Sequence, residues 1–298
     1  MEKNLSLSRS NSILLTVAAY LAALCCAILV VRATSLQHPL AQLALGDLVA
    51  TVVIFLFSVA LNNSSMYDPY WSLKPLVFAV YYLMFPSLAG EGVLMGSWRL
   101  LLVTTLILLY SIRLTSNFYR DWPGLKHEDW RYQEFRKQYP KIYWLMSFFG
   151  IHFFPTVMVY LGCLPLFGIW QAGQTPFNLT DLAGGLILTG AIILAFTADE
   201  QLRRFRKNPA NKGMAITTGL WGISRHPNYL GEILTWWGLF LVGLAAGIGY
   251  WWTGIGAVMI TLMFLFISIP MIEKRNLQRR KGYTDYIERV PELVPKLL

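Results

Sequence analysis

The chain has 298 residues, of which 55% are hydrophobic and only 14% are charged, and its mean hydropathy is +0.48. Soluble domains carry about 25% charged residues, so this composition excludes an ordinary soluble globular protein. The formal net charge of +9 raises the alternative of a nucleic-acid-binding protein. The basic residues are confined to short segments between apolar runs, however, so no nucleic-acid partner is expected.

The apolar residues are gathered in eight runs, at 13–31, 48–61, 75–89, 100–112, 148–170, 182–198, 233–250 and 251–269. The first run has about the length that a hydrocarbon core of roughly 30 Å requires, and it is longer than a signal-peptide core. Several others are shorter and need flanking residues or a thinner bilayer to cross. The sequence therefore predicts an all-α, polytopic membrane helix bundle with about 7–8 transmembrane helices, in contact with membrane lipids.

Basic residues are distributed unevenly between the two sides of this predicted bundle. With eight crossings both termini lie on one side, and only Arg32 and Arg99 of the 25 Lys and Arg residues fall on the other. Cytoplasmic segments carry such an excess, so both termini are predicted to be cytoplasmic. The expected membrane is the inner membrane in a bacterial host and an internal, ER-type membrane in a eukaryotic one. The cysteines and histidines show neither a disulfide framework nor metal-ligand spacing, so no metal is expected.

Two segments supply candidate acid–base groups. Asp68 stands among aromatic residues at 66–72, where burial would raise its pKa and suit it to donate a proton or contact a carbonyl. An Asp-Pro turn between helices explains it equally well. Tyr110 and Arg113 are three apart and share a helix face; such a pair can polarise a carbonyl or anchor the chain at the membrane interface. Residues 129–136 are typical of an amphipathic surface helix, which covers a cofactor or lies on the lipid.

A third segment is strongly basic. Two acidic residues, Asp199 and Glu200, close an apolar helix, and four basic residues follow within two turns: Arg203, Arg204, Arg206 and Lys207. Asp199 and Arg203 are four apart and can share a face. Cations at a helix C-terminus complement its dipole, while the planar fork of Arg suits phosphate oxygens. Spacing alone supports a structural role and a phosphate site equally.

The stretch Ser-Arg-His-Pro-Asn-Tyr-Leu-Gly-Glu at 224–232 places several polar groups at the start of a helix. Pro227 is compatible with the first helical turn, where its missing N–H costs nothing. Helix N-termini attract anions, and Arg225 adds positive charge there. Glu232 then enters an otherwise apolar helix. Ionisable residues in membrane helices are usually functional, although a Glu at a helix start also serves as a dipole partner.

Together these motifs resemble the steroid 5α-reductase-like membrane reductases, in the bacterial and plant-type branch once catalogued as a domain of unknown function. The resemblance runs from about residue 60 to the C-terminus. It rests on Asp-Pro-Tyr-Trp-Ser at 68–72, Glu-Asp-Trp-Arg at 128–131, Ala-Asp-Glu-Gln at 198–201 with Arg203 and Phe205, Gly-Leu-Trp at 219–221, the stretch 224–232, and the tail motifs at 273–275 and 282–286.

The resemblance implies an anchor helix and connection at 1–46 and a membrane catalytic domain at 47–298. It implies an NADPH-dependent oxidoreductase of the 3-oxo-5α-steroid 4-dehydrogenase type, acting on the C=C bond of a hydrophobic enone, steroid-like or another lipid. Tyr110 and Asp68 would contact the ketone, although the animal enzymes have the longer Glu at the Asp68 position. The implied cofactor contacts are Arg113, Asp199, Arg203, Arg206, Lys207, Trp221, Ser224, Arg225, His226, Asn228, Tyr229 and Glu232.

Two other interpretations stay open. Isoprenylcysteine carboxyl methyltransferases also carry an Arg-His-Pro-x-Tyr segment before a helix and use S-adenosylmethionine. The Asp68 motif, the Ala-Asp-x-Gln helix end and the arginines at 203–206 argue against that enzyme class. A non-catalytic membrane scaffold or lipid-binding protein would leave Asp68, Glu232 and the arginines as topology and packing features. Binding of NADPH, of the methyl donor, or of neither distinguishes the three.

Overall fold

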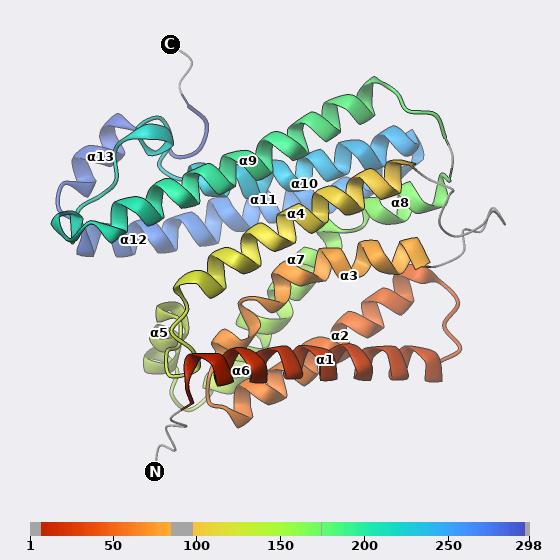
Figure 1. The fold of residues 1–298 in the computed structure, drawn as a ribbon, viewed down its shortest axis with the longest axis horizontal. Coiled ribbons are helices and arrows are strands. Elements are labelled where there is room, and N and C mark those ends of the chain that lie inside the picture. Colours follow the sequence, from red (N-terminus) through yellow and green to blue (C-terminus); the bar gives the residue numbers. More distant parts are fainter. Residues whose placement is uncertain (1–6, 85–97, 174, 296–298) are drawn as a thin grey trace. The chain divides into compact units, whose positions relative to one another are not determined.

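The computed structural model describes residues 7–84, 98–173 and 175–295, which form helices joined by turns and loops (Figure 1). Within these ranges no β-strand occurs, and Met214 and Lys281 form an isolated bridge. The α-helices are α1 (Arg9–Ala33), α2 (Pro39–Ala60), α3 (Tyr70–Met84), α4 (Trp98–Asp121), α5 (Trp130–Gln138), α6 (Tyr143–Met146), α7 (Phe154–Gly162), α8 (Pro165–Gln171), α9 (Leu179–Lys207), α10 (Pro227–Ala246), α11 (Ile255–Met263), α12 (Ile269–Arg279) and α13 (Tyr283–Arg289). The predicted all-α class is confirmed.

Seven helical segments in the described part of the chain are long and apolar enough to cross a membrane. They are Arg9–Ala33, Pro39–Ala60, Trp98–Asp121, Tyr143–Gln171, Leu179–Lys207, Pro227–Ala246 and Ile248–Arg279. Many of their Leu, Ile, Val and Phe side chains are exposed, as a lipid-facing surface requires. The protein is therefore an integral, multi-pass membrane protein with a helix bundle, as predicted.

The second and third predicted helices differ in length from their apolar runs. α2 begins at Pro39 and continues through Asp47, whereas the predicted apolar run began only after this charged residue, at 48. Asp47 is tolerated there because Lys74 of α3 lies 2.8 Å away and both side chains are buried. α3 has 15 described residues and ends at Met84, so the end of the predicted run 75–89 lies outside the described residues. The eighth crossing, and the shared side of the termini that depends on it, stays a prediction.

The predicted helix at 148–170 is interrupted. A π-helix (Ser147–Phe153) separates α6 from α7, and a turn at Cys163 separates α7 from α8. Such wide turns arise where an extra residue is accommodated in a helix, and they often occur at functional sites. In this chain the π-helix positions the buried side chains of Ser147 and His152.

The chain forms two compact units. Unit 1 comprises Met1–Tyr82 and Ser111–Cys163, and unit 2 comprises Leu83–Tyr110 and Leu164–Leu298. In unit 1, α1 packs on α2 through alanines such as Ala19 and Ala23, which contact a cluster containing Ile54 and Tyr67. Small residues allow close packing between membrane helices. Residue 46, the end of the predicted anchor segment, falls within α2.

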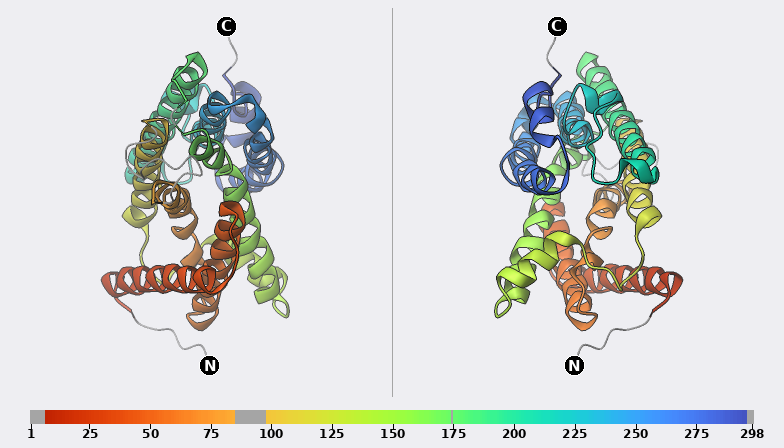
Figure 2. Two further views of the ribbon diagram at one scale, coloured as in Figure 1. Left: turned by 90° about the vertical axis from the view of Figure 1, so that its right-hand side faces the viewer. Right: turned by 90° about the vertical axis from the view of Figure 1, so that its left-hand side faces the viewer.

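In unit 2, α9 and α10 lie along each other over most of their lengths (Figures 1 and 2). A Cβ atom added at Gly231 would lie 2.8 Å from the carbonyl oxygen of Ala191, and one at Gly238 would lie 2.7 Å from the backbone nitrogen of Leu188. Only glycine permits this approach. The contact fixes the end of α9 beside the beginning of α10, where the basic and polar motifs occur.

A buried ion pair holds the beginnings of α4 and α9 together in unit 2. The guanidinium of Arg99 donates to both carboxylate oxygens of Asp181, from Nε at 2.6 Å and from Nη2 at 2.7 Å. It also donates to Thr175 Oγ1 and to the carbonyl oxygens of Thr175 and Pro176. From the sequence, Arg99 was interpreted only as one of two basic residues on the far side of the membrane. In the structure Arg99 is a structural residue that binds Asp181.

Candidate functional site

The motif Ala-Asp-Glu-Gln at 198–201 attaches the loop after α9 to the end of that helix. The backbone N–H of Leu220 donates to Gln201 Oε1 at 3.0 Å, and the indole N–H of Trp221 donates to the carbonyl oxygen of Ala198 at 3.0 Å. α10 then begins at Pro227, in the first helical turn as predicted. These contacts hold Trp221 and the start of α10 against the end of α9.

The C-terminal segment closes the other side of the same region. Arg280 donates to the carbonyl oxygen of Met214 at 2.5 Å, and the backbone N–H of Lys281 donates to the carbonyl oxygen of Gly213 at 3.0 Å. The hydroxyl of Tyr286 donates to the carbonyl oxygen of Trp221 at 2.5 Å. The ends of α9 and α12, the start of α10 and α13 therefore surround a common space.

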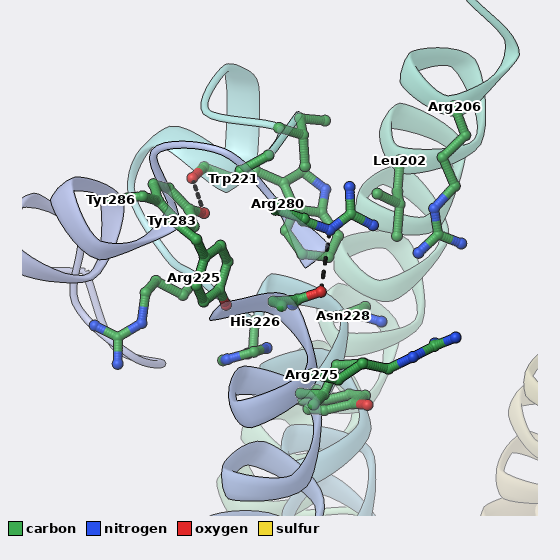
Figure 3. A pocket seen from close by; sticks show the side chains of 15 residues that line it. Leu202, Arg206, Trp221, Arg225, His226, Asn228, Arg275, Arg280, Tyr283 and Tyr286 are labelled. Carbon is green, nitrogen blue, oxygen red and sulfur yellow. Dashed lines mark hydrogen bonds between the residues drawn. The ribbon is translucent and has the colours of Figure 1, made fainter. Parts of the chain in front are cut away.

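This space is a pocket within unit 2 (Figure 3). Its described lining is basic and aromatic with some apolar residues, and contains no Asp or Glu: Leu202, Arg206, Ala215, Ile216, Trp221, Arg225, His226, Asn228, Tyr229, Ile272, Arg275, Asn276, Arg280, Tyr283 and Tyr286. Four arginines provide charge and forked donors for phosphate or carboxylate oxygens. The lining therefore fits an anionic ligand with aromatic or apolar parts.

Six predicted cofactor residues line this pocket: Arg206, Trp221, Arg225, His226, Asn228 and Tyr229. Sequence reasoning missed the contribution of α12 and α13, which is Ile272, Arg275, Asn276, Arg280, Tyr283 and Tyr286. The tail motifs were recognised as part of the resemblance but were not assigned to the site. The available signal was the basic and aromatic composition of residues 274–286. Its basic residues were interpreted only as a sign of the cytoplasmic side.

Arg225 has a different environment from the other arginines of the pocket. Its Nε donates to Glu273 at 2.7 Å, and its Nη1 donates to the carbonyl oxygens of Ile287 and Val290 at 3.1 and 2.7 Å. In Figure 3 its guanidinium points away from those of Arg206 and Arg280. Arg225 thus holds the C-terminal segment in place, whatever contact it makes with a ligand.

His226 shares the same carboxylate. Its Nε2 lies 3.0 Å from Glu273, and its ring stacks on that of Tyr229 with centroids 5.5 Å apart. Ser224 is buried, and its hydroxyl accepts a hydrogen bond from the backbone N–H of His226. These contacts order the predicted motif at the start of α10 and present Asn228 and Tyr229 to the pocket.

Arg203 has an acidic partner, Glu200, three residues earlier. Arg203 donates to both carboxylate oxygens of Glu200, and Arg204 also donates to Glu200 at 2.9 Å. The four-residue spacing predicted that Asp199 and Arg203 can share a helix face, and both lie on α9. Asp199, Arg203 and Lys207 lie on α9 outside the lining of the pocket, so only Arg206 of the basic cluster reaches it.

Deeper in unit 2, the hydroxyl of Tyr110 donates to Glu232 Oε2 at 2.9 Å, and both residues are buried. Trp236 packs edge-on to the Tyr110 ring, with centroids 6.1 Å apart. Glu232 follows Asn228 by four residues on α10, so the two share a helix face about 6 Å apart along the axis. Tyr110 therefore lies about one helical turn of α10 beyond a residue that lines the basic pocket.

Asp68 and Arg113 belong to unit 1. Asp68 accepts a hydrogen bond from the hydroxyl of Tyr132 and lies 3.7 Å from Arg131 of α5. α5 is the helix predicted at 129–136, and Asp129 caps its N-terminus by accepting from the backbone N–H of Arg131. Arg113 is buried on α4. The proposed contacts of Asp68 with a ketone and of Arg113 with a cofactor stay predictions.

Burial raises the pKa of Asp68 from 3.8 to about 7, although Arg131 and Tyr132 lower it. A carboxyl group whose pKa is higher in the folded state makes the protein less stable as pH rises between these values. Asp68→Asn should therefore remove a destabilisation of up to about 4 kcal/mol above pH 7 and change little near pH 4. Unfolding of both proteins in detergent across this range measures the difference, and equal stability at every pH would contradict the assigned pKa.

The fold and the site define a multi-pass helical membrane protein with a basic pocket between helix ends. The chain belongs to the family described as "Protein of unknown function (DUF1295)", whose model matches residues 54–290. The "Uncharacterized protein C594.04c" of Schizosaccharomyces pombe is 29% identical over 267 residues, which cover 82% of this chain and 76% of that protein. No solved structure matches the chain.

Proposed function

We propose that the protein is an NADPH-dependent membrane reductase of a carbon–carbon double bond conjugated to a ketone in a lipid. The observation that carries this proposal is the position of the basic pocket relative to Tyr110. Four arginines line the pocket, and α10 connects it through Asn228 and Glu232 to the buried hydroxyl of Tyr110. The resemblance of the sequence motifs to steroid 5α-reductase-like proteins supports the same activity. The uneven distribution of Lys and Arg supports a topology with both termini on the cytoplasmic side.

The chemistry of the lining favours a phosphorylated cofactor over S-adenosylmethionine. NADPH carries a pyrophosphate and a 2′-phosphate, which suit the guanidinium groups of Arg206, Arg275 and Arg280. Trp221 and Tyr229 offer aromatic surface to the flat rings of a dinucleotide. A sulfonium cation would meet unfavourable potential in a lining that contains several arginines and no described acidic residue.

NADPH, when bound, would supply a hydride to the β-carbon of the enone, and a proton from water would complete the α-carbon. Tyr110 would donate a hydrogen bond to the ketone oxygen and stabilise the enolate that develops, an interaction that is strong in a site of low dielectric. A phenol has one proton, and in this structure that proton is directed to Glu232. Tyr110 therefore serves the ketone when its hydroxyl turns from Glu232 to the ketone oxygen, which makes Glu232 a positioning residue.

Parallel calorimetric titrations of the purified protein in detergent with NADPH and with S-adenosylmethionine test the proposal. Binding of NADPH without binding of the methyl donor is expected, and enone steroids and other enone lipids can then be screened by NADPH oxidation. Binding of S-adenosylmethionine alone would establish the methyltransferase interpretation. Binding of neither would favour a scaffold.

Arg206→Ala should weaken binding of NADPH by roughly 10- to 100-fold, the value of one charge-assisted hydrogen bond. Binding of NADH should change much less if Arg206 contacts the 2′-phosphate. Arg204→Ala is the matched control, because Arg204 is exposed, pairs with Glu200 and does not line the pocket. Equal losses of NADPH and NADH binding in Arg206→Ala would assign this arginine a structural role.

A further inference from the structure

Unit 1 contains a series of neighbouring buried polar side chains that the proposed function does not use. It begins at Glu128, the only member whose exposure is not below one-tenth, and ends at the ion pair of Asp47 and Lys74. The members between them come from α2, α3, α6, α7, the π-helix and the 3₁₀ helix Ser64–Tyr67: Thr51, Ser58, Ser64, Tyr67, Tyr70, Tyr143, Ser147, His152 and Thr156. We call this set the polar track. Polar groups inside a membrane bundle are costly and often mark ion or proton pathways.

The outer half of the polar track leads from Glu128 to the π-helix. The hydroxyl of Tyr143 donates to Glu128 at 3.0 Å and lies 2.7 Å from the hydroxyl of Ser64. The hydroxyl of Ser64 in turn lies 2.9 Å from that of Ser147. His152 continues the series, because its Nδ1 lies 2.9 Å from the carbonyl oxygen and 3.5 Å from the hydroxyl of Ser147.

The inner half leads from Tyr67 to the ion pair. The hydroxyl of Tyr67 lies 2.8 Å from that of Thr156, which lies 2.8 Å from that of Thr51. Tyr70 lies beside the ion pair, with its ring centroid 5.6 Å from Lys74 Nζ. The step from Thr51 to Asp47 therefore needs a side-chain reorientation or a bridging water. Lys74 lies 2.8 Å from Asp47.

The two halves meet at His152. Its Nε2 lies 3.0 Å from the hydroxyl of Ser58, and its ring contacts that of Tyr67 with centroids 5.0 Å apart. Transfer between the halves needs one side-chain reorientation or one bridging water. Hydroxyl and imidazole groups both donate and accept hydrogen bonds, which is the property that a series of proton transfers requires.

We propose that the polar track conducts protons between the Glu128 end and the Asp47–Lys74 pair. A proton entering at Glu128 forms an O–H bond there, and each following group gains a proton as it releases its own to the next. The last transfer forms an O–H bond on Asp47, so that a neutral carboxyl stands beside the ammonium of Lys74. The reverse sequence returns the proton to the surface.

Groups on several helices face the two ends of the path. Besides Lys74 of α3, Asp47 has Tyr160 of α7 and Cys163 within electrostatic range. Arg136 of α5 lies 3.1 Å from Glu128 at the other end and keeps a positive charge beside the entrance. The Lys74–Asp47 pair therefore has a hydroxyl and a thiol group in its neighbourhood, and Lys74 is buried.

Hydrogen exchange at Lys74 tests the path. The full chain is labelled with ¹⁵N-lysine and placed in lipid nanodiscs, and the Lys74 ammonium signal is assigned from its loss in Lys74→Met. The exchange rate of this ammonium is measured after transfer to D₂O. Tyr67→Phe, Ser64→Ala and Thr156→Val each remove one hydroxyl of the track and should slow exchange about tenfold or more. Ser111→Ala is the matched control, because Ser111 is a buried hydroxyl of unit 1 outside the track.

A merely structural network predicts the opposite sign. Loss of a packing hydrogen bond increases local opening, so it should accelerate exchange at Lys74. Unchanged or faster exchange in the three variants, or an ammonium in the unmodified protein that does not exchange, would overturn the proposal. The thermal unfolding of each variant identifies one that fails to fold, and the remaining variants then decide the result. The outcome does not depend on whether the protein binds NADPH.

Discussion

Replacing Arg99 with methionine is expected to destabilise unit 2 by about 3–5 kcal/mol, because Asp181 would keep a buried charge without its partner. The side chains of both residues are no more than 2% exposed. The guanidinium makes two parallel hydrogen bonds to the carboxylate and three further bonds to Thr175 and Pro176. Unfolding of the purified protein in detergent, followed by circular dichroism, measures the loss.

The double variant Arg99→Met with Asp181→Leu separates the cost of an unpaired charge from the contribution of the pair. Apolar replacement of both partners is often neutral, so most of the stability should return. A deficit of roughly 1 kcal/mol should remain, because Asp181 also completes the capping box of α9 with Asn178. Arg204→Met removes an exposed ion pair and should cost less than about 1 kcal/mol. A single variant as stable as the double variant would contradict this account.

The class of membrane protein and most of its helices could be predicted from the sequence, because a helix that crosses the bilayer needs a long apolar run. The proximity of Arg206, Trp221 and Asn228 was also predictable, since one loop connects the adjacent helix ends that carry them. The contribution of α12 and α13 to the pocket could not be predicted, because hydrogen bonds from Arg225 to the carbonyl oxygens of Ile287 and Val290 position this C-terminal segment. Nothing local in the sequence encodes that contact.

The buried ion pairs illustrate the same limit. Arg99 and Asp181 are 82 residues apart, and Asp47 and Lys74 belong to different helices. A single sequence shows each of them as an isolated charge in or beside an apolar run, and topology or a turn explains such a charge without a partner. Tyr110 and Glu232 were both singled out, but as separate groups with different roles, and only the structure shows that they form a hydrogen bond.

Tyr110→Phe should slow enone reduction about a hundredfold, which is the loss expected when one hydrogen-bond donor to a developing oxyanion is removed. Binding of NADPH should be nearly unchanged. The substitution keeps the ring that packs against Trp236 and removes only the hydroxyl. Tyr20→Phe is the matched control, since Tyr20 is a tyrosine of unit 1 whose hydroxyl donates to the carbonyl oxygen of Met66. Single-turnover oxidation of bound NADPH by an enone steroid measures the rate of the chemical step without the contribution of product release.

The variant Glu232→Gln tests whether Tyr110 acts by donating its hydroxyl proton in a hydrogen bond to the ketone. The amide can donate to the phenol oxygen, which frees the proton of Tyr110 for the ketone. We therefore expect Glu232→Gln to retain reduction. The double variant Tyr110→Phe with Glu232→Gln should be as slow as Tyr110→Phe alone, because Glu232 acts only through the tyrosine. Unchanged turnover in Tyr110→Phe would remove this tyrosine from the mechanism, and a further loss in the double variant would show that Glu232 has a role of its own.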